Sequence, residues 1–222
     1  MKAMILAAGR GERMRPLTDE LPKPLLKVGD KALILWHVQK LVACGFKEII
    51  INIAHLGYKI PELLGDGSKH GVKILYSDEQ ESGALESAGG IKKALPLLGD
   101  DTFLVVNGDV FCDYDFDSSF NLGDKLAHLI LVENPLHNPK GDFGLNEASV
   151  LNESNNKYTF SGIGYYNPKI FDTLACGKSG LAPLLRENIK SQNVSGFLYN
   201  GDWHDIGTPQ RLKEINDRFK ND

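Results

Sequence analysis

The stretch Lys2–Pro16 reads KAMILAAGRGERMRP, and the segment Leu21–Leu25, LPKPL, follows it closely. Lys2–Leu6 is a short apolar run that predicts a buried strand. A glycine- and arginine-rich turn after such a strand is a common phosphate cradle in α/β proteins, because small residues let main-chain N–H groups approach the anion and the cations neutralise it. Lys23 adds a second cation on a stiff support, since a proline on either side fixes φ.

Two common phosphate-binding motifs do not fit. The dinucleotide fingerprint G-x-G-x-x-G would need a third glycine where Met14 stands, and that glycine allows close helix–strand packing. The P-loop pattern is met only at its end, by residues 177–179, because Asp172 stands where its first glycine belongs. An ordinary strand-to-helix turn with solvated arginines remains the alternative for residues 7–16, and the nearby lysine segment disfavours it.

Three segments together resemble the signature of the sugar-1-phosphate nucleotidylyltransferases. They are the first loop with its lysine segment, the VNGD of Val106–Asp109 and the WHDIGTP of Trp203–Pro209, so the resemblance runs from Met1 to about Leu212. Within this family, the sequence most resembles the N-acetylmuramate 1-phosphate uridylyltransferases of bacterial cell-wall recycling. The supporting segments are LGDGS, ALPLLGD and NGDV, which begin at residues 64, 94 and 107.

Composition and charge narrow the class of protein further. The chain of 222 residues suits one large α/β domain, and its net charge of −4 disfavours general binding to nucleic acids or membrane surfaces. Residues 1–31 hold seven Lys and Arg against four Asp and Glu, a local charge of +3 that suits a nucleoside triphosphate. The sequence has no C-x-x-C pair, so no zinc site is expected. It also has no charged leader before an apolar stretch and no apolar run long enough to span a bilayer, which predicts a cytoplasmic protein.

Strand-like and helix-like segments alternate, which predicts an α/β fold with a Rossmann-like, mostly parallel mixed sheet covered on both faces. Strands are expected at Lys2–Leu6, Lys47–Ile53, Val72–Tyr76, Thr102–Asn107, Ala127–Glu133 and Val194–Tyr199. Helices are expected around Ile34–Val42, and at Gly89–Leu98, 180–191 and Pro209–Phe219. The carboxyl ends of such strands form the binding crevice, where the loops after Leu6 and Val106 both lie.

The chain is expected to form a single nucleotidyltransferase domain over residues 1–222. From Asn134 to Gly164, Pro, Asn and Gly become frequent, which indicates a small β-rich insert that closes over one end of the sheet. The resemblance implies that residues 1–133 mainly bind the nucleotide and residues 134–200 mainly the sugar, while 201–222 carry a second metal ligand and a terminal helix.

Two aspartates are candidates for holding a metal ion. Asp109 follows a predicted strand, and a carboxylate at the carboxyl end of a strand is a common ligand for Mg²⁺, which keeps some waters and is completed by substrate phosphates. The alternative is a turn aspartate. Asp205 precedes Thr208 and Pro209, a predicted N-cap and first helical residue, and the resemblance makes it the second metal ligand. Neighbouring side chains alternate on an extended segment, so His204 is expected to point elsewhere.

The resemblance implies attack by the phosphate of a sugar 1-phosphate on the α-phosphate of a nucleotide, with pyrophosphate leaving. Both reactants are anions, so positioning and charge neutralisation matter more than a nucleophilic side chain. The expected parts are one or two Mg²⁺ on Asp109 and Asp205, Arg13 on the leaving phosphates and Lys23 near the α-phosphate. The predicted catalytic residues are therefore Arg13, Lys23, Asp109 and Asp205.

The expected ligand contacts fall into two groups. The nucleotide is predicted to meet Ala7, Ala8, Gly9, Gly11, Glu12, Arg13, Lys23, Glu79, Glu86 and Asn107, and the sugar to meet Asp142, Gly144 and Glu153, which match sugar-contacting positions of the family. Ser87 and Ala88 depart from the Leu-Glu-Thr-Gly-Gly of relatives, so the choice of base is less firmly implied. Lys140 and Arg186 are both candidates for the lactyl carboxylate of muramic acid.

The resemblance implies transfer of UMP from UTP to N-acetylmuramic acid 1-phosphate, giving UDP-N-acetylmuramic acid and pyrophosphate. One alternative is the same chemistry with another pair, such as heptose or mannose 1-phosphate with GTP, or glucose 1-phosphate with UTP or dTTP. A non-catalytic sugar-nucleotide sensor is an alternative of another class. The expected partners are these small molecules and no nucleic acid or membrane, and both monomer and homodimer remain open.

Overall fold

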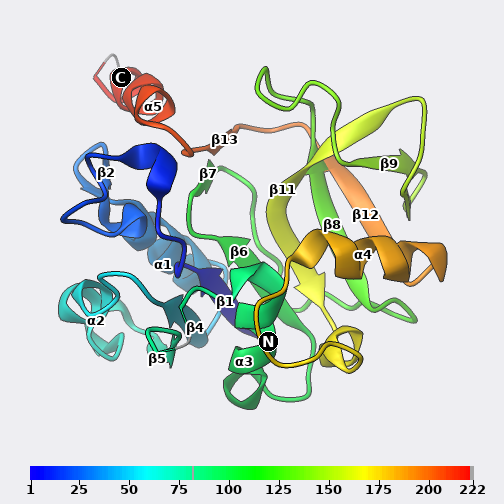
Figure 1. Cartoon of the computed structure of the whole chain (residues 1–222), viewed down its shortest axis with the longest axis horizontal. Coiled ribbons are helices and arrows are strands. Elements are labelled where there is room, and N and C mark those ends of the chain that lie inside the picture. Colours follow the sequence, from blue (N-terminus) through cyan, green and yellow to red (C-terminus); the bar gives the residue numbers. More distant parts are fainter. Residues whose placement is uncertain (82, 221–222) are drawn as a thin grey trace.

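A nine-stranded mixed sheet organises the chain, which the computed structural model describes at residues 1–81 and 83–220 (Figure 1). Its strand order is β5-β4-β1-β6-β11-β8-β12-β10-β9. The strands are β1 Lys2–Leu6, β4 Glu48–Ile53, β5 Lys73–Asp78, β6 Phe103–Asn107, β8 Ala127–Val132, β9 Phe143–Asn146, β10 Ser149–Leu151, β11 Lys157–Tyr166 and β12 Val194–Tyr199. Short ladders outside the sheet join β2 Lys27–Val28 to β3 Lys31–Ala32, and β7 Val110–Cys112 to β13 Trp203–Asp205.

The first half of the sheet is parallel, as the alternation of elements predicts. β5, β4, β1 and β6 are neighbours in that order and all run in one direction. Beyond β6 most pairs are antiparallel, and β12 beside β8 is the parallel exception. The predicted Rossmann-like mixed sheet is therefore confirmed, and the bounds expected for β1 and β12 agree with the structure.

Alternation along the strands builds a core on each face of the sheet. Ile5 of β1 and Ile51 of β4 belong to one buried cluster. The residue before each of them, Met4 or Ile50, points to the opposite face of the sheet and belongs to a second buried cluster. The first cluster includes residues of α1 and α2, and the second includes residues of α3 and α4 (Figure 1). The helices are α1 Leu33–Ala43, α2 Lys59–Leu64, α3 Glu86–Leu98, α4 Leu181–Lys190 and α5 Pro209–Arg218. Over the described ranges, none has the length and apolar content to cross a membrane.

The segment predicted as an insert takes part in the sheet itself. β11 lies between β6 and β8, with Ile163 opposite both Val106 and Ile130. Its six residues from Ser161 to Tyr166 are all buried, because neighbouring strands flank it on both edges. The β-rich part is thus continuous with the half that is predicted to bind the nucleotide. The local sequence pattern does not reveal this, because strand partners depend on tertiary packing.

Two adjacent tyrosines on β11 offer a test of this buried centre. Tyr165 and Tyr166 are both fully buried, but only the Tyr165 hydroxyl has a partner, the N–H of Asp117 at 2.8 Å; within residues 1–81 and 83–220 the Tyr166 hydroxyl has none. An unpaired buried hydroxyl costs about 1–3 kcal/mol. We expect Tyr166→Phe to raise the free energy of unfolding by about 1 kcal/mol and Tyr165→Phe to lower it by a similar amount. Chemical denaturation measures both, and a destabilised Tyr166→Phe protein would contradict the assignment.

Candidate active site

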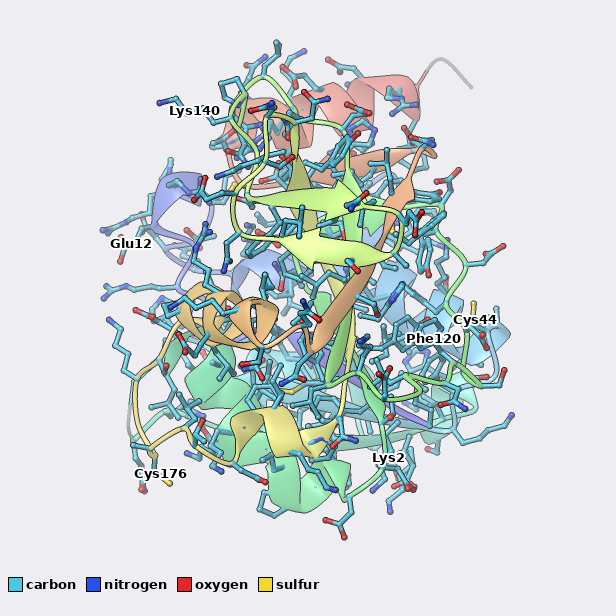
Figure 2. All side chains as sticks on the ribbon, turned by 90° about the vertical axis from the view of Figure 1, so that its right-hand side faces the viewer. Lys2, Glu12, Cys44, Phe120, Lys140 and Cys176 are labelled. Atoms are coloured by element: carbon cyan, nitrogen blue, oxygen red, sulfur yellow. The ribbon has the colours of Figure 1, made fainter. Side chains whose placement is uncertain are left out.

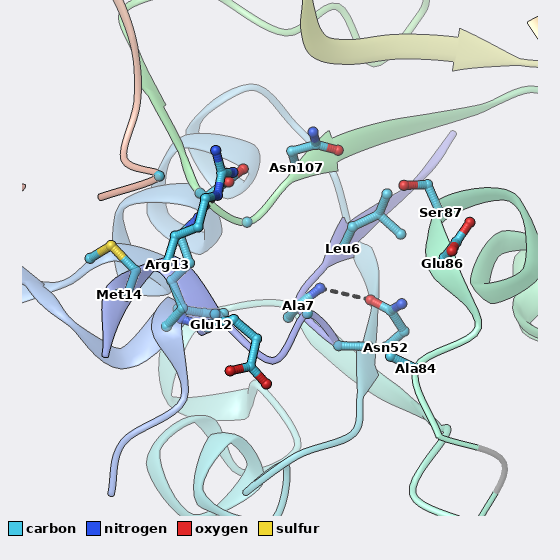
Figure 3. Close-up of a pocket in the computed structure, with 18 of the residues that line it drawn as sticks. Leu6, Ala7, Glu12, Arg13, Met14, Asn52, Ala84, Glu86, Ser87 and Asn107 are labelled. Atoms are coloured by element: carbon cyan, nitrogen blue, oxygen red, sulfur yellow. Dashed lines mark hydrogen bonds and ion pairs between the residues drawn. The ribbon is translucent and has the colours of Figure 1, made fainter. Parts of the chain in front are cut away.

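A cleft of about 330 Å³ opens at the carboxyl ends of the parallel strands (Figure 3). Leu6 of β1 is in register with Asn52 of β4 on one side and Asn107 of β6 on the other. The chain proceeds from β1 to β4 and β5 on one side and then returns to β6 on the other, and a crevice forms at such a switch point. The cleft is lined by Leu6, Ala7, Ala8, Gly9, Gly11, Glu12, Arg13, Met14, Lys23, Pro24, Asn52, Glu79, Ala84, Glu86, Ser87, Asn107, Gly108, Asp109 and Gly207.

All ten residues predicted to contact the nucleotide line this cleft. Figure 3 shows Glu12 and Arg13 on one side of it and Glu86 and Ser87 on the other, with Asn107 at its edge. The structure therefore brings together side chains from loops that are far apart in the chain. Their contacts with a nucleotide stay a prediction.

The first loop owes its shape to Gly11. This residue has φ of 69°, in the left-handed region that favours glycine, and a Cβ there would lie 2.9 Å from Cγ2 of Thr18. The Thr18 hydroxyl donates to the Gly11 carbonyl at 2.8 Å. A 3₁₀ helix, Glu12–Met14, starts at this turn and carries Arg13 into the cleft.

The three arginines of this loop differ in their partners. Arg10 pairs with Glu12 at 2.8 Å, and Arg15 pairs with Asp19 at 2.6 Å. Arg13 makes no ion pair or hydrogen bond with the residues that the structure describes, although it lines the cleft. Its guanidinium is therefore the cation of this loop that is available to an anion in the cleft, whereas Glu12 already serves as a partner of Arg10.

Lys23 and Asp109 form an ion pair in the cleft. Lys23 begins a 3₁₀ helix, Lys23–Leu25, directly after Pro22, and its Nζ lies 2.5 Å from Oδ2 of Asp109. The side chains are 13% and 28% exposed, so both are reachable by a ligand and shielded enough for their charges to interact strongly. The predicted cation and the predicted metal ligand thus stand side by side.

A buried network around Asn52 fixes the floor of the cleft. Asn52 accepts the N–H of Ala7 at 2.7 Å and donates to Oε1 of Glu79 at 2.8 Å, while Oε2 of Glu79 accepts the N–H of Leu85 at 2.8 Å. A Cβ at Gly90 would come within 2.6 Å of Oε1 of Glu79, which is why a glycine stands there. Glu79 and Asn52 thus link Leu85 to Ala7 of the first loop.

The N-terminal end of α3 forms the opposite wall. Glu86 and Ser87 line the cleft there, and Lys178 pairs with Glu86 at 3.4 Å. The N–H of Gly89 donates to the carbonyl of Ser179 at 3.0 Å, and the N–H of Ser179 donates to the carbonyl of Leu85 at 2.9 Å. Residues 177–179, which match the end of a P-loop pattern, therefore fix the start of α3 through main-chain hydrogen bonds of Ser179.

The ladder between β7 and β13 brings the two predicted metal ligands together. Asp205 stands opposite Val110, the residue after Asp109, and the N–H of Ile206 donates to the Asp109 carbonyl at 2.7 Å. Thr208 caps α5 by accepting the N–H of Arg211, as predicted. Two aspartates that are 96 positions apart in the chain are held next to each other by main-chain hydrogen bonds.

The Asp205 side chain nevertheless points into a neighbouring cavity of about 590 Å³, which shares Arg13 with the cleft. Its carboxylate pairs with Arg211 and lies 3.1 Å from Nε2 of His137. Nε2 of His204 lies 2.9 Å from Oδ1 of Asp202, although His204 borders the same cavity as Asp205. The wall between the cavities is thin, since a Cβ at Gly207 would clash with Arg211 and lie 3.3 Å from Nη2 of Arg13.

The donor set fits Mg²⁺. Among the described residues no group of three or more His, Cys, Asp or Glu side chains could hold a metal ion. In the predicted site the protein would supply the carboxylates of Asp109 and Asp205, and substrate phosphates and water would supply the other ligands. An all-oxygen site completed in this way is typical of Mg²⁺ and unlike a zinc site.

The predicted sugar contacts lie outside the cleft. Oδ2 of Asp142 accepts the N–H of Phe160 at 2.8 Å, and Gly144 packs so closely on Ser154 that a Cβ would clash. Glu153 is 85% exposed at its side chain and pairs with Lys157. These three residues shape and border the β9–β11 region in this structure, so direct contact with a sugar stays a prediction for them.

The two candidate partners of a lactyl carboxylate also lie apart from the cleft. Lys140 is exposed at the surface (Figure 2). Arg186 of α4 lies over the ring of Phe143, 5.1 Å from its centroid, and its Nη2 is 3.4 Å from the Asp142 carbonyl. Both alternatives stay open.

Comparison with known proteins gives a consistent set of relatives. A family described as nucleotidyl transferase matches residues 2–222. An N-acetylmuramate alpha-1-phosphate uridylyltransferase from Neisseria meningitidis serogroup B is 56% identical over 96% of this chain and 96% of that protein. A UTP–glucose-1-phosphate uridylyltransferase from Synechocystis sp. is 30% identical over 93% of this chain and 60% of that protein. A solved structure from Bacillus anthracis, provisionally described as a glucose-1-phosphate thymidylyltransferase, has a TM-score of 0.86 at 25% identity and covers 100% of this chain and 96% of its own.

The chain belongs to the nucleotidyl transferase family. The match extends over nearly its whole length, and the mixed sheet with its crevice at the strand ends agrees with the fold of the Bacillus anthracis protein. The resemblance stated from the first loop, the VNGD segment and the WHDIGTP segment is thereby confirmed. The more specific resemblance to the N-acetylmuramate 1-phosphate uridylyltransferases is confirmed by the Neisseria protein.

Sequence reasoning missed three residues that shape the site. Asn52 lies in the apolar run Ile49–Ile53, which was read only as a strand. A single amide side chain in such a run indicates a buried hydrogen bond, and this signal could have identified it. His137 and Arg211, which contact Asp205, carry no such signal, because 68 and 6 positions separate them from it and only the fold brings them together.

Replacement of Asn52 tests the network beneath the cleft. In Asn52→Ala the N–H of Ala7 and the buried carboxylate of Glu79 both lose a partner. We expect the free energy of unfolding to fall by about 2 kcal/mol and the KM for the nucleotide to rise, because the first loop loses its anchor. Denaturation and steady-state kinetics measure the two effects. Ser77→Ala, on the neighbouring strand and also buried, is the control, and equal behaviour of both variants would contradict a role for Asn52 in the site.

Proposed function

We propose that this chain transfers UMP from UTP to N-acetylmuramic acid 1-phosphate and releases pyrophosphate, with Mg²⁺ as the metal. One juxtaposition carries the reaction type. The Lys23–Asp109 pair and the guanidinium of Arg13, which has no partner among the described residues, line one cleft next to the ladder that brings Asp205 to Asp109. The substrate pair rests on the name and the 56% identity of the Neisseria meningitidis relative.

The charges in the cleft suit a reaction between two anions. Arg13 lies at the end of the cleft formed by the first loop and is proposed to hold the leaving phosphates. Lys23, on its stiff proline-flanked support, would turn from Asp109 to the α-phosphate when the nucleotide binds. Asp109 and Asp205 would hold Mg²⁺, which would supply further positive charge to the reacting phosphates. These groups neutralise and orient the reactants, which is the main requirement of phosphoryl-type transfer.

The nucleotide and the sugar would occupy different parts of the site. Main-chain groups of Ala7–Gly9 would lie near the base. The Asn52 network holds the N–H of Ala7, and a Cβ at Gly9 would meet nothing within 4 Å, so the backbone there is open to a ligand. The sugar would lie toward β11 and the β-rich region, beyond Asn107. A place in cell-wall recycling and a cytoplasmic location follow from this choice of substrates and are part of the proposal.

Pyrophosphate release tests the proposal directly. The protein with Mg²⁺ is assayed with UTP, dTTP, GTP, CTP and ATP, each combined with N-acetylmuramic acid, N-acetylglucosamine, glucose and mannose 1-phosphates. We expect turnover with UTP and the muramic acid phosphate. Lys23→Ala should lower kcat/KM by roughly 100- to 1000-fold, the usual effect of losing one preorganised charge-stabilising group. The exposed Lys27 serves as the matched control in Lys27→Ala, which should keep normal turnover.

Each other outcome has a definite meaning. Turnover with a different pair, such as mannose 1-phosphate with GTP, would retain the reaction and overturn the named substrates. Release of pyrophosphate by Lys23→Ala at a normal rate would overturn the role of the lysine. No turnover with any pair would favour the sugar-nucleotide sensor.

A further inference from the structure

Arg211 is a partly buried cation that has no role in the reaction proposed above. It lies in α5, the helix that follows β13 (Figure 1). Its side chain is 17% exposed, and its Nη1 forms an ion pair with Oδ1 of Asp205 and lies 2.7 Å from Nε2 of His137. Arg211 therefore contacts the carboxylate that is proposed to bind Mg²⁺, and it lines the cavity of about 590 Å³ beside the cleft.

Gly207 allows Arg211 to lie close to the cleft. A Cβ at Gly207 would clash with the guanidinium of Arg211 and lie 3.3 Å from Nη2 of Arg13, so both guanidinium groups lie close to this residue. Arg13 itself borders the cleft and the cavity. A glycine at this position thus leaves room for two cations next to the proposed reacting centre.

The cavity that Arg211 lines adjoins the part of the chain that is proposed to bind the sugar. Residues 135–137, which come shortly after β8, form part of its wall. Trp203 also lines it, and its Nε1 donates to the carbonyl of Ser161 on β11 at 3.0 Å. Small-molecule sites usually have volumes of about 300–1,000 Å³, so a cavity of about 590 Å³ is large enough for a sugar phosphate.

The charge available in this cavity depends on the partner of Asp205. Two further charged residues of α5 line the cavity and are already engaged, since Arg218 has a carboxylate partner and Glu214 accepts a hydrogen bond from Gln210 at 2.9 Å. A metal ion on Asp205 would compete with Arg211 for that carboxylate. The displaced guanidinium would then offer its N–H donors to an anion in the cavity.

We propose that Arg211 is a displaceable partner of Asp205, which holds the carboxylate until Mg²⁺ binds and then binds the phosphate of the sugar 1-phosphate. This inference rests on the proposed function, in which Asp205 is a metal ligand. There Arg13 and Lys23 act on the phosphates of the nucleotide, whereas the attacking phosphate of the sugar has no cation assigned to it. A guanidinium presents its N–H groups in a planar fork that suits both carboxylate and phosphate, so the same group can serve both partners in turn.

Metal affinity tests the displacement. Mn²⁺ is titrated, with UTP but without a sugar phosphate, into the wild type, Arg211→Gln and Lys213→Gln, a control that removes an exposed cation from the same helix. Because the wild-type guanidinium competes with the metal, we expect Arg211→Gln to bind Mn²⁺ about threefold or more tightly, the effect of losing one modest ion pair. Arg211→Lys, which keeps the charge, should restore most of the wild-type affinity, and the control should be unchanged. Unchanged or weaker Mn²⁺ binding by Arg211→Gln would overturn the displacement.

Steady-state kinetics test the contact with the sugar phosphate. In Arg211→Gln the KM for N-acetylmuramic acid 1-phosphate should rise by about tenfold or more, because a hydrogen bond from a charged donor is lost, while the KM for UTP stays within about twofold. A residue that only braced α5 would weaken the binding of metal and sugar phosphate together, so the opposite directions of the two effects distinguish the proposed role. An unchanged KM for the sugar phosphate, or equal rises of both KM values, would overturn the contact.

Asp205→Asn separates failure of this inference from failure of the proposed metal site. If Asp205→Asn binds Mn²⁺ as tightly as the wild type, Asp205 is not a metal ligand, and the metal site and this inference are both wrong. If Asp205→Asn binds Mn²⁺ more weakly while Arg211→Gln binds it like the wild type, the metal site stands and only the displacement by Mg²⁺ is wrong.

Discussion

The ion pair between Lys23 and Asp109 joins the first loop to the end of β6, and the arrangement of the cleft depends on it. A site for two polyanionic substrates has to hold its cations in place before either substrate arrives. Proline residues on both sides of Lys23 fix its backbone, and Asp109 gives its ammonium group a partner. The pair is accessible enough to exchange that partner for a phosphate.

The second aspartate, Asp205, also has ion-pair partners in this structure. Asp205 is balanced by Arg211 and His137 just as Asp109 is balanced by Lys23, so each carboxylate that is proposed to bind the metal has a cationic or potentially cationic partner in this structure. Main-chain hydrogen bonds between β7 and β13 hold the backbones of Asp109 and Asp205 next to each other whichever partners the side chains have. Substrate and metal binding would then exchange ion pairs around a fixed backbone, which limits the reorganisation that the reaction requires.

Much of the fold and part of the site could be predicted from the sequence because they depend on local patterns. Apolar runs such as Ile49–Ile53 mark strands, and the glycine, arginine and proline residues of the first loop mark a phosphate cradle. The placement of β11 between β6 and β8 could not be predicted, since strand partners depend on packing over the whole chain. The Asn52 network and the partners of Asp205 were missed for the same reason: Ala7 and Asn52 are 45 positions apart, and Asp205 and His137 are 68 apart. Only the motif match predicts sugar contacts for Asp142, Gly144 and Glu153. In this structure they make contacts within the β-rich region, with Phe160, Ser154 and Lys157 respectively.

Metal affinity in the presence of UTP tests the central claim, that Asp109 and Asp205 form one metal site. Mn²⁺, a paramagnetic stand-in for Mg²⁺, is titrated into the wild type and into Asp109→Asn, Asp205→Asn and Asp124→Asn, the last being an exposed control. The account predicts that each of the first two variants binds Mn²⁺ at least about tenfold more weakly and that the control is unchanged. Wild-type affinity in Asp205→Asn would contradict it and leave Asp205 as a structural partner of Arg211 alone.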